Sequence, residues 1–281
     1  MALYQPTLRL SPSGYPLDFA ITTDDLENRS IVPGQTVSSA LTRIYQKRVE
    51  YLDVEDDPLA LWNFNDTLAA VRGPSLSLGA GTFAFTDVYP GVRGLEVAIG
   101  CRLDAPLTPN LQLQGDMSVE MLLQLDTSPT ACWMCGVGGT SSVAAAQNAS
   151  WGLMFPNATV PRGIQGFWQS GSGVARGFTT ATTSGNPSLP PIHMIMTVGF
   201  SRSGIDGIPY LNGRAFGPPI SGVAAPTAGT SGIFTIGARP GATCPDQFLV
   251  LSIAVYNRVR PASEWLGSFN RSIGNGLGFT P

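Results

Sequence analysis

The chain has 281 residues, of which 43% are hydrophobic and only 12% are charged, and its net charge is −3. This composition can supply one large core, whereas 33 glycines and 23 prolines leave little room for long helices. The arginines are scattered and lysine occurs once, which argues against nucleic-acid binding, and no apolar run reaches the ~18 residues that a membrane span needs.

The N-terminal region differs from the rest of the chain in its charge. Residues 1–66 contain ten of the 19 acidic residues, and their first part is rich in extended and turn-forming sequence. The first residues lack the basic and apolar regions of a signal peptide, so we expect a chain made in the cytoplasm. We interpret residues 1–57 as an extended attachment arm and residues 58–281 as one domain.

One short helix is expected inside the arm, at about residues 36–47. Pro33 and Gly34 break the chain before it, and Thr36 can cap its first turn. A helix this short needs a surface to pack on, either its own domain or another chain. Its apolar positions fall on one face and form the predicted attachment surface: Val37, Ala40, Leu41, Ile44 and Tyr45.

The segment from Ile31 to Ile44 resembles a "P-G-x-T-V-x-x-A-L" segment of bacteriophage tail-fibre and other virion appendage proteins. The resemblance implies that the arm attaches the chain to other virion proteins, and to copies of itself, on the outer surface of a particle.

Residues 58–281 contain short β-rich runs separated by turn signals. The run before Ser201 is expected to end in a turn at Ser201–Gly204. An Asn212-Gly213 pair is expected to close a tight hairpin, and an acidic turn at Ala262–Glu264 is expected after the last run. Alternate residues of a half-buried strand face opposite sides, so buried positions should be flanked by exposed ones. The strands are expected at 61–66, 95–99, 117–125, 192–198, 210–213, 233–237 and 248–258, with Trp62, Phe64, Ile195, Ile236, Val255 and Tyr256 in or beside the core.

In this order, the strands resemble those of the laminin-G-like members of the concanavalin-A-like jelly rolls. The resemblance covers residues 58–270 and rests on a His-led strand, a Tyr-x-Asn-Gly hairpin, an Ile-Gly strand end and a last strand ending in Tyr-Asn-Arg. It implies an all-β fold, a two-sheet antiparallel jelly-roll sandwich that carries the arm and its short helix.

Cys132 and Cys135 have the spacing of a zinc or redox site, but a zinc ion needs about four ligands. The strand context argues against a redox motif, which sits at a helix start. Buried thiols are favoured over one disulfide or a metal site, for which the remaining ligands would be Cys101, Cys244 and His193.

The same jelly roll hosts β-glucanases, which place paired carboxylates on one strand in an E-x-D-x-x-E pattern. Here Glu120 is followed by leucines and Asp126 lies at a strand end, so we expect no enzyme. Related sandwiches hold calcium with Asp and backbone oxygens, but Asp206 and Asp246 are isolated acids. The sequence therefore predicts no metal ligands and no cofactor.

The segment 164–173 is the predicted ligand surface. It places Trp168 and Gln169 in a glycine-rich stretch, with Arg176 nearby in sequence. An aromatic ring can stack on the apolar face of a sugar while amide and guanidinium groups bind its hydroxyls. The alternative is that Trp168 packs in the core, because tryptophan is highly buried on average.

Two functions fit these patterns. The favoured one is a non-enzymatic component of a tailed-phage virion, a fibre, spike or decoration protein, that binds a host-surface glycan or stabilises the particle. The alternative is a free bacterial carbohydrate-binding or adhesion module exported by another route. Dependence of assembly on residues 1–57 separates the two.

Overall fold

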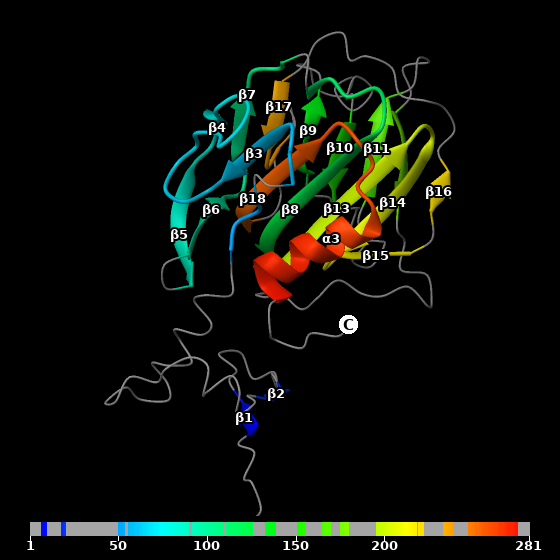
Figure 1. Cartoon of the computed structure of the whole chain (residues 1–281). Coiled ribbons are helices and arrows are strands. Elements are labelled where there is room, and N and C mark those ends of the chain that lie inside the picture. Colours follow the sequence, from blue (N-terminus) through cyan, green and yellow to red (C-terminus); the bar gives the residue numbers. More distant parts are fainter. Residues whose placement is uncertain are drawn as a thin grey trace, which may run out of the picture.

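The computed structural model describes residues 7–9, 18–20, 50–53, 56–89, 92–108, 111–125, 133–138, 151–155, 165–169, 175–179, 195–217, 219–221, 233–238 and 247–274. Within these residues the main body is a sandwich of two antiparallel sheets with one short helix, α3 (Figure 1). The jelly-roll sandwich predicted from the sequence is confirmed.

The larger sheet has nine strands in the order β15-β14-β13-β8-β18-β6-β5, with β16 paired to β14 and β3 paired to β18. Three long strands, β13, β8 and β18, form its centre. The strands are β3 (Ala60–Asn63), β5 (Phe83–Tyr89), β6 (Val92–Val97), β8 (Met117–Leu125), β13 (Ile195–Ser203), β14 (Asp206–Leu211), β15 (Arg214–Ala215), β16 (Ile220–Ser221) and β18 (Phe248–Tyr256).

The smaller sheet has seven strands in the order β12-β11-β10-β9-β17-β7-β4. They are β4 (Ser77–Ala80), β7 (Arg102–Ala105), β9 (Trp133–Gly138), β10 (Trp151–Met154), β11 (Gln165–Gln169), β12 (Ala175–Thr179) and β17 (Ile233–Ile236). In the N-terminal region, β1 (Thr7–Arg9) and β2 (Asp18–Ala20) pair with each other in a separate two-stranded sheet.

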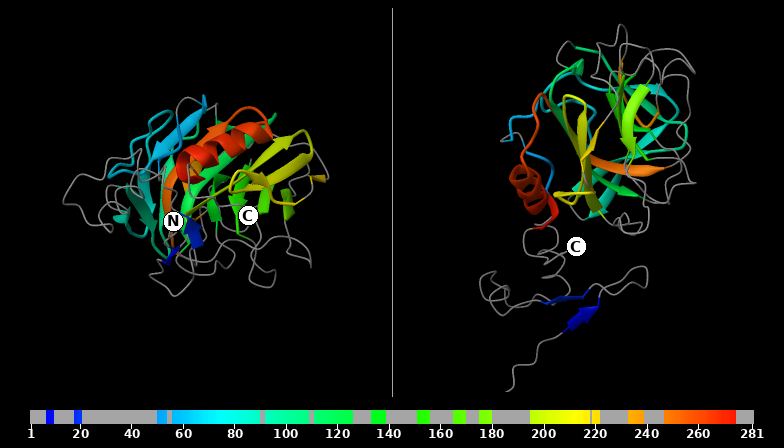
Figure 2. Two further views of the ribbon diagram at one scale, coloured as in Figure 1. Left: turned by 60° about the horizontal axis from the view of Figure 1, so that its bottom comes forward. Right: turned by 90° about the vertical axis from the view of Figure 1, so that its right-hand side faces the viewer.

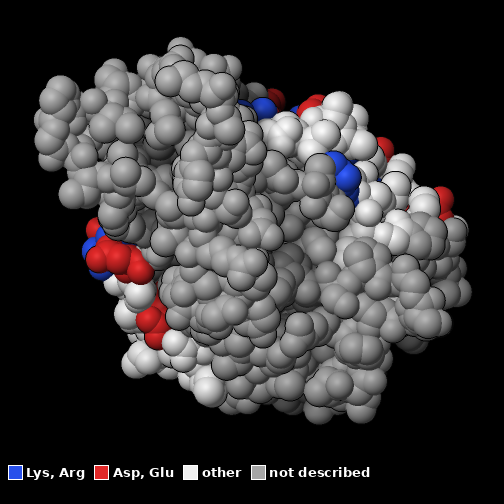
Figure 3. Space-filling view, turned by 90° about the horizontal axis from the view of Figure 1, so that it is seen from below, with Lys and Arg blue, Asp and Glu red and all other residues white. Residues whose placement is uncertain are grey.

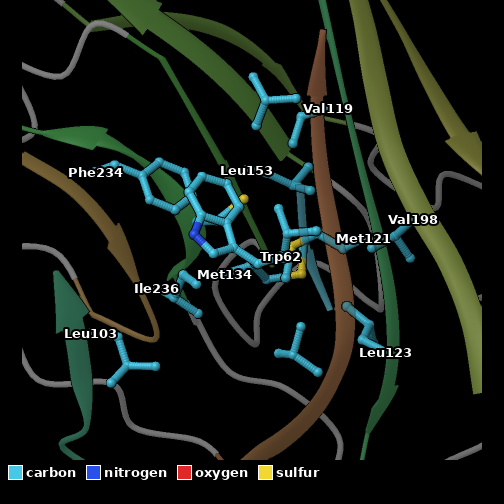
Figure 4. Packing of buried hydrophobic residues seen from close by; sticks show 14 of the residues in the cluster. Trp62, Leu103, Val119, Met121, Leu123, Met134, Leu153, Val198, Phe234 and Ile236 are labelled. Carbon is cyan, nitrogen blue, oxygen red and sulfur yellow. The ribbon is translucent and has the colours of Figure 1, made fainter. Parts of the chain in front are cut away.

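The main core fills the space between the two sheets. Trp62 stacks on Phe234 with ring centroids 4.7 Å apart (Figure 4). The Trp151 ring lies against the same phenylalanine, with centroids 6.0 Å apart. The Trp151 indole N–H donates to the carbonyl of Leu111, so its polar atom is satisfied inside the core. Six positions were predicted to be buried in or beside the core, and all of them are: Trp62, Phe64, Ile195, Ile236, Val255 and Tyr256.

The predicted Asn-Gly hairpin is confirmed between β14 and β15. Asn212 and Gly213 have φ values of 48° and 75°, and Leu211 pairs with Arg214 across the turn. These positive values explain why the turn uses Asn and Gly. The predicted turn at Ser201–Gly204 is misplaced, because β13 continues to Ser203, pairing Ser201 with Ser118 of β8.

The expected alternation of buried and exposed positions is wrong for the central strands. Every residue of β18 is buried, and so is nearly every residue of β8 and β13. The reason is a second apolar cluster on the outer face of the nine-stranded sheet, which joins Leu52, Leu61, Leu122, Tyr256 and Phe269 with their neighbours. A strand covered on both faces carries no period-two burial pattern.

The helix that covers this outer face was not predicted. The expected acidic turn at Ala262–Glu264 is instead the first turn of α3 (Ala262–Phe269), which continues into the π-helical turn η2 (Asn270–Gly274). Proline precedes the first turn and glutamate lies within it, as at many helix starts. The helix lies along the outer face of the nine-stranded sheet (Figure 2). Trp265 and Phe269, one turn apart, are both buried and hold the helix there.

Candidate functional site

The densest group of polar contacts in the described residues lies between α3 and the nine-stranded sheet. Glu120 of β8 is fully buried there, and its Oε2 accepts hydrogen bonds from Arg260 Nη1 at 2.5 Å and from Ser268 Oγ at 2.8 Å. Arg260 is also fully buried, and its Nη2 donates to the Asp56 carboxylate and to the carbonyl of Glu264. The pair joins the sheet to the helix.

Aromatic rings enclose this ion pair. The Arg260 guanidinium lies 4.5 Å from the centre of the Tyr256 ring and 4.9 Å from that of Trp265. Trp265 stacks on Tyr210 with centroids 4.3 Å apart, and its indole N–H donates to Ser201. Flat rings over a guanidinium shield it from water while keeping a favourable cation–π contact.

Burial raises the pKa of Glu120, and the hydrogen bonds and charge of Arg260, together with Ser268, oppose that rise. A catalytic carboxyl group must reach the atom it protonates or attacks. The Glu120 carboxylate is instead sealed beneath α3 and occupied by Arg260 and Ser268. It therefore serves as a structural anchor and is not available as a general acid or nucleophile in this conformation.

The outer face of the seven-stranded sheet is built differently. One register row crosses five of its strands and contains only short side chains or glycine: Ser77, Asp104, Thr235, Gly136 and Gly152. Asp104 pairs through both carboxylate oxygens with Arg102, at 2.8 and 2.9 Å.

An aromatic residue lies beside this row. A Cβ atom on Gly136 would lie 2.9 Å from the Trp133 ring, so glycine lets the indole lie flat against the strand. Met154 of β10, which pairs with Trp133, packs against the same ring. On this face a buried tryptophan, a thioether and an ion pair thus lie beside a row of small residues.

The predicted ligand residues fall on neighbouring strands near one margin of the seven-stranded sheet. Trp168 of β11 is directly opposite Arg176 of β12, so the structure brings their backbones together, whereas Gln169 pairs with Ala175. Trp168 is also opposite Trp151 of β10. Trp168 and Arg176 therefore occupy one register row of the sheet, and Gln169 occupies the next row. The side chains of these three residues lie outside the described part.

The predicted attachment helix also lies outside the described residues, so its five apolar positions remain a prediction: Val37, Ala40, Leu41, Ile44 and Tyr45. The described chain resumes at Glu50, whose backbone N–H donates to the carbonyl of Ser272 in η2. Residues 50–53 and 56–57 therefore lie on the outer face of the nine-stranded sheet, and the arm joins the sandwich beside α3.

Cys101 and Cys135 are buried thiols, as predicted for these two residues, and burial raises the pKa of Cys135. The other two cysteines and His193 lie outside the described residues. Within the part that is described, no three His, Cys, Asp or Glu side chains are grouped so that they could hold a metal ion. Among the same residues, no helix is long and apolar enough to cross a membrane.

Charged groups on the described surface are sparse and mixed in sign. On the face seen in Figure 3, basic side chains lie singly or beside acidic ones and form no continuous stripe. Arg93, for example, pairs with both Asp66 and Asp87, and Arg72 pairs with Asp57. Binding to a nucleic-acid backbone needs clustered positive charge, which the described part of this face does not offer.

The residues that anchor α3 were not predicted, although the sequence contains a signal for this helix. Pro261 followed by Ser263 and Glu264 is a helix-start pattern, and Trp265 and Phe269 have the i, i+4 spacing of one buried helix face. The partnership of Arg260 with Glu120 joins residues 140 apart in sequence, and no local pattern reveals such a pair.

Comparison with known proteins yields similarity in structure only. No family model matches the chain, and no curated protein sequence matches it. Among solved structures, the receptor-binding domain of a botulinum neurotoxin C/D mosaic serotype has a TM-score of 0.55 and 11% identity, over 76% of this chain and 51% of that one. The binding domain of botulinum neurotoxin DC in complex with SialylT gives 0.53 and 10%, over 79% and 51%.

A sialidase of Trypanosoma rangeli is also similar, with a TM-score of 0.53 and 15% identity over 79% of this chain and 34% of the sialidase. This chain thus spans about half of the neurotoxin chains and a third of the sialidase chain. At such identities the similarities show a shared β-sandwich fold.

Proposed function

We propose that this protein is a non-enzymatic glycan-binding component of a tailed-phage virion, attached through residues 1–57 and displaying the sandwich on the outer surface. The proposal rests mainly on the structural difference between the two outer faces of the sandwich. The junction with the arm, α3 and η2 all lie on the face of the nine-stranded sheet. The seven-stranded sheet, which carries Trp168 and Arg176 near its margin, forms the other side of the sandwich.

The fold supports the glycan part of the proposal. The solved structures that share it include a neurotoxin binding domain in complex with SialylT, another in complex with N-acetylneuraminic acid, and a sialidase. A binding domain of the same toxin type is also known with rat synaptotagmin II, a protein partner. By analogy with these structures, we propose that this chain also recognises a cell-surface ligand. A glycan is the favoured class of ligand, because the predicted site offers a tryptophan beside a guanidinium.

The burial of Glu120 supports a binding role over hydrolysis. A glycosidase of the two-carboxylate type needs acids that reach the sugar from both sides of the bond. Glu120 lies at the centre of the sheet, yet α3 covers it and Arg260 neutralises it. Several exposed acids of the described residues are paired with arginines, as in the contact of Arg72 with Asp57.

Glycan binding can be tested with the full chain on a glycan array, using Trp168→Ala as the site variant. We expect binding to fall at least ~30-fold, because truncating an aromatic anchor costs about 2 kcal/mol and each tenfold change is about 1.4 kcal/mol. Leu78→Ala is the matched control, since Leu78 lies on β4 at the opposite end of the same sheet and is 49% exposed. It should leave binding unchanged.

The same variants separate the site from the core alternative. If Trp168 packs in the core, Trp168→Ala should lower the free energy of unfolding by about 3–5 kcal/mol. Urea denaturation measures this loss. Unchanged glycan binding together with unchanged stability would rule out this site. Arg176→Gln tests the neighbouring position, and Arg214→Gln, an exposed arginine on the other sheet, is its control.

Attachment to the particle can be tested by comparing the full chain with a chain that begins at Glu50. We expect assembly with virion proteins, or with copies of the chain, only when residues 1–49 are present. Glycan binding should survive the truncation. A full chain that assembles with neither would favour the alternative of a free adhesion module. A truncated chain that still assembles would contradict the attachment role of the arm.

A further inference from the structure

Residues 50–53 and 56–57 are bound along the outer face of the nine-stranded sheet at several points. The Tyr51 hydroxyl donates to the carbonyl of Arg93 at 2.8 Å and accepts from the Arg93 N–H at 3.1 Å. Leu52 is buried in the second apolar cluster, and its N–H donates to Ser252 Oγ of β18. The carbonyl of Leu52 accepts from Asn63 of β3. We call the described residues 50–53 and 56–57 the strap.

The strap also binds the C-terminal segment of the chain, and one residue makes most of these contacts. Asp56 Oδ2 accepts from Arg271 Nη2 of η2 at 2.5 Å and from Arg260 Nη2 at 3.2 Å. The carbonyl of Asp56 accepts from Arg258 Nη2. At the other end of the strap, the N–H of Glu50 donates to Ser272. The strap and the α3–η2 segment therefore share their anchors.

Charge balance makes Asp56 more important than an ordinary surface acid. The ion pairs around α3 among the described residues join three arginines to three acids: Arg258, Arg260 and Arg271 to Asp56, Glu120 and Glu264. The Asp56 side chain is 13% exposed and that of Arg260 is fully buried. A buried charge depends on its partners, because it has no water to replace a lost one. Without the Asp56 carboxylate, Arg260 keeps Glu120 but the cluster holds an excess positive charge.

We propose that the strap couples the attachment arm to the C-terminal helix, so that displacement of the strap from the sheet loosens α3 and η2 together. The contacts at Tyr51 and Leu52 hold the strap to the sheet, and Asp56 carries the coupling to Arg260 and Arg271. In the attached state, the strap holds α3 against the sheet and fixes the direction in which the arm leaves the sandwich. The role in attachment rests on the proposed function, whereas the coupling itself does not.

Hydrogen exchange on the full chain tests the coupling, with Asp56→Asn as the variant. The substitution keeps the shape of the side chain but removes its charge. We expect amide exchange to rise about tenfold in residues 258–274 as well as in residues 50–53, which corresponds to about 1.4 kcal/mol of local opening free energy. Exchange in β9 and β10 of the far sheet should not change.

Asp57→Asn is the matched control, because Asp57 is the next residue and pairs only with the exposed Arg72. Amide exchange in residues 258–274 should be the same in Asp57→Asn as in the unmodified chain. Tyr51→Phe removes the two contacts with Arg93 and should raise exchange in residues 50–53 and, through Asp56, in 258–274.

The coupling would be overturned if Asp56→Asn raised exchange in residues 50–53 alone, with 258–274 unchanged. Equal effects of Asp56→Asn and Asp57→Asn would also overturn it, since a general charge effect would then suffice. If Asp56→Asn unfolds globally, amide exchange will also be faster in β9 and β10. In that case the exchange of Tyr51→Phe in residues 258–274 tests the coupling instead. Glycan binding measured on the same samples is expected to be unchanged, so its absence in every sample counts against the proposed function and not against the strap.

Discussion

The two outer faces of the sandwich differ in what packs on them among the described residues. On the nine-stranded sheet, α3 and the strap cover a second apolar cluster and a buried ion pair, Glu120 with Arg260. On the seven-stranded sheet, Asp104, Gly136 and Gly152 lie in one row of small residues, with an ion pair at Arg102 that is about a fifth exposed. The covered face holds the parts of the chain together, and the other is formed by the strands alone among the elements described.

This comparison predicts that the same type of substitution has unequal effects on the two faces. Arg260→Met should destabilise the protein by about 3–5 kcal/mol, because it leaves Glu120 buried without its charged partner. Arg102→Met breaks a two-point ion pair on the other face, where both side chains are about a fifth exposed, and should cost no more than about 1 kcal/mol. Urea denaturation of both variants checks the difference, and equal losses would contradict it.

Close packing of α3 gives the next effect in size. A Cβ atom at Gly199 of β13 would lie 2.1 Å from the carbonyl oxygen of Val119 and 2.7 Å from the Trp265 ring. Gly199→Ala should therefore destabilise the protein by about 1–3 kcal/mol and weaken the contact of α3 with the sheet. Gly115→Ala is the control, because no atom lies within 4 Å of the added Cβ. Thermal melts should show a clearly lower Tm for Gly199→Ala than for Gly115→Ala. An unchanged Tm for Gly199→Ala would mean that α3 does not pack closely on the sheet.

The pH dependence of stability sharpens the comparison further. Burial raises the pKa of Glu120 above its unfolded value of 4.5, so the folded chain binds this proton more tightly than the unfolded chain does. Stability associated with Glu120 should consequently fall as the pH rises from 4.5 through the folded pKa. Relative to Glu120→Gln, the unmodified protein should lose stability across this window. A difference between the two proteins that does not vary between pH 4 and pH 7 would contradict this assignment.

Glu264, at the exposed rim of the same cluster, should show the opposite and smaller trend. Hydrogen bonding to Arg258 lowers the pKa of Glu264, so its contribution is present above the unfolded pKa of 4.5 and is lost as the pH falls through the folded value. Its side chain is a third exposed, and salt should weaken the contact. Denaturation of Glu264→Gln at low and neutral pH, with and without added salt, measures the effect; a trend parallel to that of Glu120 would be inconsistent with the two environments.

Local sequence patterns predicted the parts of the fold that local chemistry determines. The hairpin at Asn212-Gly213 follows from the φ values that these residues adopt readily, and β8 spans the residues expected for it, 117–125. The buried positions Trp62 and Ile236 follow from apolar runs between turn signals.

Features that depend on distant contacts were not predictable in this way. The full burial of β18 follows from α3 and Leu52 packing on its outer side, and its own sequence contains no sign of either. The ion pair of Arg260 with Glu120 depends on the same packing. For the ligand site, sequence gave residue types, whereas the opposition of Trp168 and Arg176 required the strand register.

Imaging of purified virions by electron cryo-microscopy tests the central claim most directly, since that claim assigns attachment to one face of the sandwich and display to the other. The account predicts density for the sandwich with α3 and residues 50–53 toward the particle and strands β10–β12 away from it. Density with the seven-stranded sheet against the particle, or purified virions that lack the chain, would contradict it.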